Sequence, residues 1–369
     1  SYQTIPFDKI SIEDYEEAII EGIRIHNNEI DAITDSQEAP TFENTIVALD
    51  RSGIILNQSV LALSNLEAAL GEPSLMAIMS NVTPILSEHS SSILLNTKLW
   101  ERIKSVHDDM GKRNDLSAED RRLISETYRN FSESGANLEG ADREKFRNLN
   151  SRLSDLCVQF SQNVTNDMSN PDRRIWVKEE NTKGLPESIK MAAREAAHDA
   201  LKNEGKEDDD KLYLFTVYAP SYIPFMTYAE NRELRERLYR LYNSRNNGGK
   251  FDNTRILKEI ANVRLEIANL MGKRNFAEYQ LQGTMAATIG NVMHLLEELR
   301  NNYTEPMKKE MAEVLEFAKT SEGADFQLQP WDYSFWSDKL KNTRYAFDTE
   351  EMKPYFELEN TISGVLGLA

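Results

Sequence analysis

Apolar residues recur every third or fourth position along most of the chain, which is the spacing of one face of an α-helix. The clearest seam runs without a break from Phe146 to Val164. A second seam runs from Ile256 to Leu270, and Gly272 stands where a C-terminal capping glycine belongs. Because strands repeat every second residue instead, this spacing predicts a mainly α, multi-helical fold.

Two helix starts are marked near the beginning of the sequence. Ser11 and Asp14 resemble a capping box, in which short polar side chains satisfy the first backbone N–H groups. Thr41 is predicted to cap a second helix, which the glycine at Gly53 weakens.

One region departs from the helical period. Residues 174–178 alternate and are rich in residues that favour strands, and residues 212–218 are rich in aromatic and β-branched side chains. They predict a small strand pair inserted between helical blocks. We therefore divide the chain into an N-terminal helical domain at 1–170, a strand-containing insertion at 171–220 and a second helical region at 221–369.

The net charge of the chain indicates which classes of partner it can bind. The 369 residues carry 61 acidic and 43 basic side chains, for a net charge of −18. Such a chain repels phosphate backbones, so no nucleic-acid partner is expected. The arginine-rich segment 230–245 does not change this, because glutamates interleave at helical spacing and favour ion pairs within the helix. No apolar run approaches a membrane span, so no membrane partner is expected either.

The single cysteine and the five histidines restrict the chemistry. Cys157 lies on the edge of the 146–164 seam and is expected to be a buried structural thiol. No two histidines lie within four residues of each other, so the HExxH zinc motif is absent. GxSxG, P-loop and GxGxxG motifs are also absent. We therefore assign no catalytic residue and no metal ligand. His26 is expected to pack half-buried, and His89 to lie on a polar surface.

Four aromatic side chains cluster between residues 331 and 336. Such a cluster is more often part of a core than a wall that binds peptides, and both interpretations remain open. The residues are Trp331, Tyr333, Phe335 and Trp336.

Several segments resemble the thimet oligopeptidase and peptidyl-dipeptidase family of zinc metallopeptidases. The first is PTFENTI at residues 40–46, and the second is YAPSYIPFM at residues 218–226. The likeness continues in order at residues 242–245, 252–254, 264–268, 271–277, 331–332 and 354–356. It spans nearly the whole chain, and its motifs lean toward the bacterial peptidyl-dipeptidase branch.

The resemblance implies a nearly all-helical, two-lobed architecture around a channel that admits short peptides. In that family the HExxH helix, a third zinc ligand and the transition-state His and Tyr residues lie in the second half, and none is present here. The chain therefore resembles the N-terminal half of a member, and residues 221–369 resemble the helical start of its catalytic domain. Zinc is expected in the full-length protein and not in this chain, and the missing C-terminal half is an expected partner.

We therefore expect this chain to be part of a zinc-dependent peptidyl-dipeptidase or oligopeptidase, and we expect the chain alone to be inactive. This part would form one wall of the substrate channel, with Trp331, Tyr333 and Trp336 as the wall residues. The alternative is a non-catalytic acidic helical scaffold that binds a peptide or protein. A cytoplasmic location is expected from the lone thiol, with a periplasmic or exported protein whose leader has been removed as the alternative.

Overall fold

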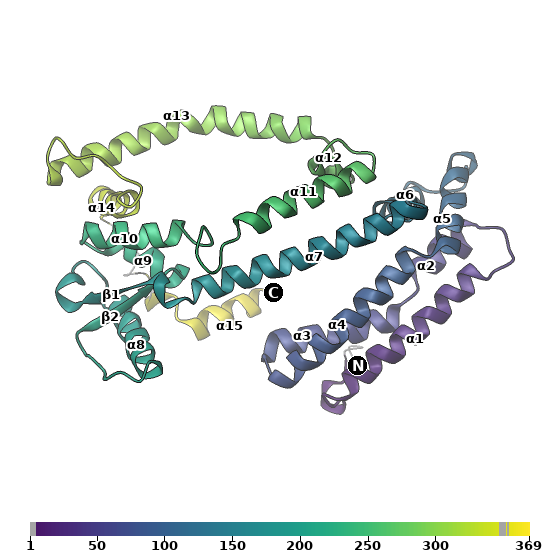
Figure 1. Ribbon diagram of the computed structural model, residues 1–369, viewed down its shortest axis with the longest axis horizontal. Helices are drawn as coiled ribbons and strands as arrows, with labels where there is room; N and C mark the ends of the chain where they lie inside the picture. Colours follow the sequence, from purple (N-terminus) through teal and green to yellow (C-terminus); the bar gives the residue numbers. More distant parts are fainter. Residues whose placement is uncertain (1–4, 347–351, 353) are drawn as a thin grey trace. The chain divides into compact units, whose positions relative to one another are not determined.

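The computed structural model describes residues 5–346, 352 and 354–369 (Figure 1). Helices hold most of these residues, and the described strands form one two-stranded sheet, so the predicted mainly α fold is confirmed. The chain forms two compact units: residues up to Arg152 with Arg264–Ala287, and Leu153–Val263 with Thr288–Ala369. Two helices, α7 (Gly140–Met168) and α11 (Thr254–Leu270), contribute residues to both units. The division into three domains at 170 and 220 stays a prediction.

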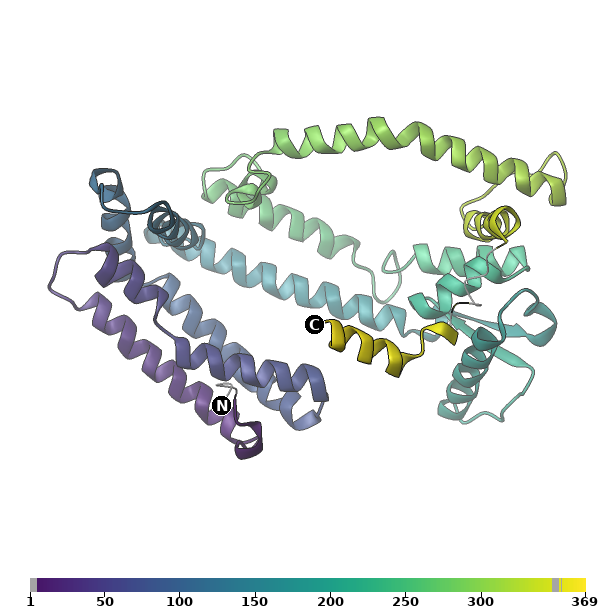
Figure 2. The ribbon, with the colours of Figure 1, turned by 180° about the vertical axis from the view of Figure 1, so that it is seen from behind.

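The first unit is helical throughout its described part. Helices α1, α3 and α4 pack on one another, and both views show them side by side (Figures 1 and 2). Two apolar clusters fill this unit, one around Ile19 and Leu63 and one around Ile46 and Ile103. Besides its parts of α7 and α11, its helices are η1 (Phe7–Lys9), α1 (Asp14–Thr34), η2 (Phe42–Val47), α2 (Ala48–Asp50), α3 (Ile54–Leu70), α4 (Pro73–Leu94), α5 (Thr97–Asp109), η3 (Met110–Lys112), α6 (Ala118–Glu133) and α12 (Phe276–Leu281).

The second unit contains the predicted strand pair. The strands β1 and β2 are antiparallel, Ile175 is paired with Phe215, and α8 packs against β2. Ile175, Phe215 and Phe225 are fully buried in the apolar cluster that this sheet shares with its helices. The elements are η4 (Pro171–Arg173), β1 (Arg174–Lys178), η5 (Glu179–Asn181), α8 (Glu187–Asn203), β2 (Leu212–Thr216), α9 (Ala219–Tyr228), α10 (Arg232–Asn243), α13 (Ile289–Glu322), α14 (Tyr333–Tyr345) and α15 (Leu358–Leu368).

The helix start at Thr41 is confirmed, with a difference in helix type. The Thr41 hydroxyl accepts from the Asn44 N–H at 3.0 Å, and the Asn44 side chain accepts from the Thr41 N–H at 2.8 Å. This capping box opens a π-helical segment, η2, rather than a regular α-helix. Gly53, with φ of 71°, then separates α2 from α3, as the glycine in the sequence suggested.

One described segment, Phe42–Leu70, is long and apolar enough to cross a membrane by length and composition alone, with a mean hydropathy of 1.3 over its most apolar stretch. In the structure 28% of that stretch is buried. Its α3 part buries Leu56 and Leu63 against neighbouring helices. Core helices and membrane spans both pass such a test of composition, so the absence of a membrane partner stays a prediction.

Two expectations about single side chains meet different outcomes. Cys157 was expected to be buried, but it is only half-buried on α7. His89 was expected on a polar surface, and this is wrong: only 8% of it is exposed. Its helix, α4, turns this residue toward α1, and the serines around it occupy the outer positions of the same helix.

Candidate functional site

The aromatic segment 331–336 lies at the start of α14, where it meets α10 and α13. Trp336 is only 4% exposed and packs with Phe335 against Val314 and Ala318 of α13. Trp336 is therefore a core residue, as one of the two interpretations of the aromatic cluster predicted. Because its surroundings are apolar side chains of this unit, Trp336 contributes to packing there.

Trp331 and Tyr333 are half-buried and have different neighbours. The Trp331 ring packs against Tyr239 of α10, and the Arg240 guanidinium lies 5.1 Å from the centre of the Trp331 ring. The Tyr333 hydroxyl donates to Glu310 of α13 at 3.0 Å. The structure thus buries Trp336 and Phe335 in one cluster, against which Tyr333 also packs, and it directs Trp331 toward α10.

Between these aromatic residues lies an ion cluster that the sequence did not indicate. Asp332 is fully buried and accepts from Arg235 Nη2 at 3.0 Å and from Arg232 Nη2 at 2.7 Å. The Gln329 N–H also donates to its carboxylate, at 3.0 Å. Burial alone would raise the pKa of Asp332, but the hydrogen bonds from Arg232, Gln329 and Arg235 hold it below its ordinary value. The carboxylate is therefore charged at neutral pH.

Burial also affects the pKa of Arg235. Desolvation lowers the pKa of this guanidinium, and its bond to Asp332 opposes that effect. Arginine still stays protonated, because its ordinary pKa lies far above neutrality. The expectation of ion pairs within the arginine-rich helix holds for Arg240 and Glu236, which are 2.7 Å apart. The same expectation is wrong for Arg232 and Arg235. Because α10 packs against the 331–336 segment, both pair with the carboxylate of Asp332, which is distant in the sequence.

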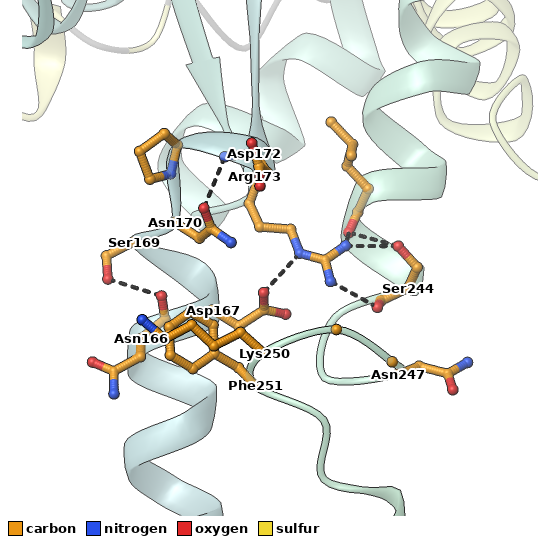
Figure 3. A pocket seen from close by; sticks show the side chains of 14 residues that line it. Asn166, Asp167, Ser169, Asn170, Asp172, Arg173, Ser244, Asn247, Lys250 and Phe251 are labelled. Carbon is orange, nitrogen blue, oxygen red and sulfur yellow. Dashed lines mark hydrogen bonds and ion pairs between the residues drawn. The ribbon is translucent and has the colours of Figure 1, made fainter.

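A polar pocket of about 820 Å³ lies at the C-terminal end of α7, beside η4 and the loop after α10. Figure 3 shows the Arg173 guanidinium between Asp167 and Ser244. Its Nε donates to Asp167 at 3.0 Å, its Nη1 to the Ser244 hydroxyl at 2.7 Å, and the Asn246 N–H donates to Asp167 at 2.7 Å. The charges of Arg173 and Asp167 already satisfy each other, so they form a structural ion pair on the wall of this pocket.

A pair of titratable side chains, His26 and His89, lies in the first unit. His89 Nε2 and His26 Nδ1 are 3.0 Å apart, and His26 Nε2 is 3.0 Å from the Ser52 hydroxyl. Burial lowers the pKa of both imidazoles, and for His26 the charge of a protonated His89 lowers it further, while Glu29 raises it. Sequence reasoning missed this pair, because 63 residues separate its members. The helical period indicated a packed face for His26, whereas His89 was expected on a polar surface.

These residues do not fit a zinc site. Structural and catalytic zinc sites use three or four convergent His, Cys, Asp or Glu ligands. Across the described ranges 5–346, 352 and 354–369, no group of three or more such side chains is placed to hold a metal. In the histidine pair, the facing nitrogens are engaged with each other. Hydrolytic chemistry is accordingly assigned to no residue of this chain.

Comparison with known proteins shows what this chain is similar to. The model of peptidase family M3 matches residues 225–369. Oligopeptidase A of Haemophilus influenzae is 32% identical over 98% of this chain and 52% of its own length. The probable cytosolic oligopeptidase A of Arabidopsis thaliana is 31% identical over 99% and 51%, and the dipeptidyl carboxypeptidase of Escherichia coli is 26% identical over 97% and 51%. The chain spans about half the length of these relatives. The resemblance predicted from the sequence is confirmed: the chain is similar to peptidases of family M3.

Proposed function

We propose that this chain is the N-terminal part of a zinc-dependent peptidyl-dipeptidase or oligopeptidase that hydrolyses short peptides, and that it forms one wall of the substrate channel. The observation that carries the proposal is the match to family M3 at residues 225–369, together with relatives named as peptidases that align with nearly the whole chain. Those names place peptide hydrolysis in the relatives. Its extension to the whole of this protein is our inference.

The proposal places the zinc ligands in polypeptide outside this chain. The described residues offer no metal group, and the sequence has no HExxH. A surface of α13 supports the idea that further polypeptide packs on this unit. Its apolar seam is buried at Val314 and Ala318, but continues toward the N-terminus of the helix with exposed side chains. These are Leu296, Leu299, Tyr303, Met307 and Met311. Large exposed apolar stripes mark interaction surfaces.

Helix α15 supports the same idea. It exposes five large apolar side chains although it lies in the segment that matches the family. An isolated helix with such a face gains stability only when the face is covered. The five residues are Leu358, Ile362, Val365, Leu366 and Leu368.

Among the proposed wall residues, Trp331 and Tyr333 are the candidates for direct contact with peptide, because part of each side chain is exposed. Trp336 supports the wall from behind, since it is buried between α13 and α14. We propose a cytoplasmic location, and a periplasmic or exported protein is the alternative. One relative is named cytosolic, and another from Arabidopsis thaliana is named chloroplastic/mitochondrial.

The test measures zinc content and peptide cleavage for two proteins, this chain alone and the longer product of the gene. The purified chain alone should hold no stoichiometric zinc in elemental analysis and should not cleave short peptides. The gene should be read beyond the codon for Ala369. An in-frame HExxH, and chelator-sensitive cleavage by the longer product, would support the proposal. A stop codon at that point would favour the acidic helical scaffold. Zinc-dependent turnover by the 369 residues alone would contradict the proposal.

A further inference from the structure

Four polar groups in the first unit form one continuous hydrogen-bonded chain. The Ser52 hydroxyl lies 2.7 Å from the Leu49 carbonyl and 3.0 Å from His26 Nε2. His26 Nδ1 lies 3.0 Å from His89 Nε2. The chain therefore joins α1, α4 and the turn that precedes α3.

The chemistry of these groups fixes the direction of every bond. A carbonyl can only accept, so the single hydroxyl hydrogen of Ser52 goes to Leu49. His26 Nε2 must then carry a hydrogen and donate it to the Ser52 oxygen. A neutral imidazole has one N–H, so His26 Nδ1 is bare and accepts from His89 Nε2–H. It follows that a neutral His89 has a bare Nδ1, and no described residue is hydrogen-bonded to that atom.

The surroundings are nearly free of charge. Glu29 is the charged group that acts on His26, and its carboxylate also accepts from the Gly53 N–H at 2.7 Å. Both histidines line a pocket of about 610 Å³ between α1, α3, α4 and α6. The other residues that line it are uncharged: Leu49, Ser52, Gly53, Leu56, Asn57, Val60, Leu86, Ser90, Ile93, Leu94 and Phe131.

We propose that His89 Nδ1 is the proton-binding site of this pocket, and that the histidine pair is a latch between α1 and α4 that keeps its form with one proton and opens with two. A first proton from solvent on Nδ1 leaves the Nε2–H of His89 in place. That N–H becomes a charged donor and bonds more strongly to His26. A second proton on His26 Nδ1 would place two N–H groups face to face across 3.0 Å.

The test is an NMR titration of the imidazole nitrogens in the intact chain, from about pH 8 to about pH 4.5. At the upper pH both histidines should carry hydrogen on Nε2. As the pH falls, Nδ1 of His89 should protonate before Nδ1 of His26. An Nδ1–H form of His89 at the upper pH, or protonation of His26 first, would overturn the proposal.

A pair of variants tests the origin of the bond direction. Ser52→Ala removes the acceptor of His26 Nε2–H, so His26 and His89 should each become a mixture of both neutral forms. Ser90→Ala changes another hydroxyl of the same pocket outside the chain and should leave both histidines as in the unmodified protein. If Ser52→Ala keeps the original single form, or Ser90→Ala loses it, the proposed role of Ser52 is wrong. Should Ser52→Ala fail to fold, the titration of the unmodified chain still decides the proposal.

Discussion

Arg235 on α10 and Asp332 before α14 form an ion pair of 3.0 Å, with 2% and 0% of their side chains exposed. Arg235 also donates to the carbonyls of Ala229 at 2.7 Å and Trp331 at 3.1 Å, and its guanidinium lies 4.1 Å from the centre of the Phe335 ring. The pair therefore joins α10 to the aromatic segment 331–336. Removing either partner should be strongly destabilising, because the remaining charge would be buried with neither a counter-charge nor water to stabilise it.

We expect Asp332→Asn to lower the free energy of unfolding by about 3–5 kcal/mol, since it leaves two guanidinium groups without their carboxylate. Urea denaturation followed by circular dichroism would measure this. The matched control is Glu313→Gln, which removes the partner of Arg344 from an exposed pair. That loss should stay below about 1 kcal/mol. Equal losses in both variants would contradict the assigned importance of burial.

Trp336 gives a second stability prediction. Trp336→Ala removes a side chain that is 4% exposed, and should cost about 3–5 kcal/mol by leaving a cavity. Tyr355→Ala removes an aromatic side chain that is 84% exposed, and should change stability by less than about 0.5 kcal/mol. Urea denaturation compares the two. A small loss at Trp336, together with a change in its fluorescence on adding a short peptide, would instead place this residue in the peptide-binding wall.

Local spacing was enough to predict much of the fold. The seam from Phe146 to Val164 lies within α7, and the alternation at residues 174–178 became β1. The Thr41 cap was also visible, because capping depends on residues three positions apart. Each of these features depends on neighbours within a few turns of the chain, and the sequence order contains that information directly.

Pairing between distant segments could not be predicted in this way. Arg235 and Asp332 are 97 residues apart, and His26 and His89 are 63 apart. The period of a helix shows that a side chain lies on a packed face, but it does not identify the helix opposite. The glutamates of the segment 230–245 offered its arginines local partners, but tertiary packing selected the buried carboxylate of Asp332 for two of these arginines.

Gly184 should not tolerate a side chain. Its φ is 86°, and a Cβ there would lie 2.3 Å from the Tyr228 carbonyl oxygen. Gly205 has a similar φ of 65° with no atom within 4 Å of such a Cβ. Both alanine variants should incur backbone strain of about 1–2 kcal/mol. Only Gly184→Ala should add a clash of about 1–3 kcal/mol or more. Thermal and urea unfolding would compare them, and equal effects would show that the contact with Tyr228 is unimportant.

The stability of the first unit should fall as the pH falls below about 6.5. Burial lowers the folded-state pKa of His26 and His89, so the unfolded chain binds more protons in that range and acid favours unfolding. Above that range both residues are neutral and their contribution is constant. Unfolding measured across pH should show this decline, and His89→Gln should reduce it. Ser90→Ala, which changes a side chain of the same pocket that does not titrate, is the control and should leave the pH profile unchanged. A His89→Gln profile identical to that of the unmodified chain would contradict the prediction.

The capping box at Thr41 should contribute measurable stability, because it satisfies backbone N–H groups that a helix start leaves free. Asn44 is shared further, since Arg102 Nη2 donates to its side-chain oxygen at 3.1 Å. Thr41→Ala removes the hydroxyl that accepts from the Asn44 N–H, and should cost about 1 kcal/mol in urea denaturation. Thr41→Ser keeps a hydroxyl at the same position and should lose much less. If serine destabilises as strongly as alanine, the stabilisation comes from packing of the threonine methyl group and not from the cap.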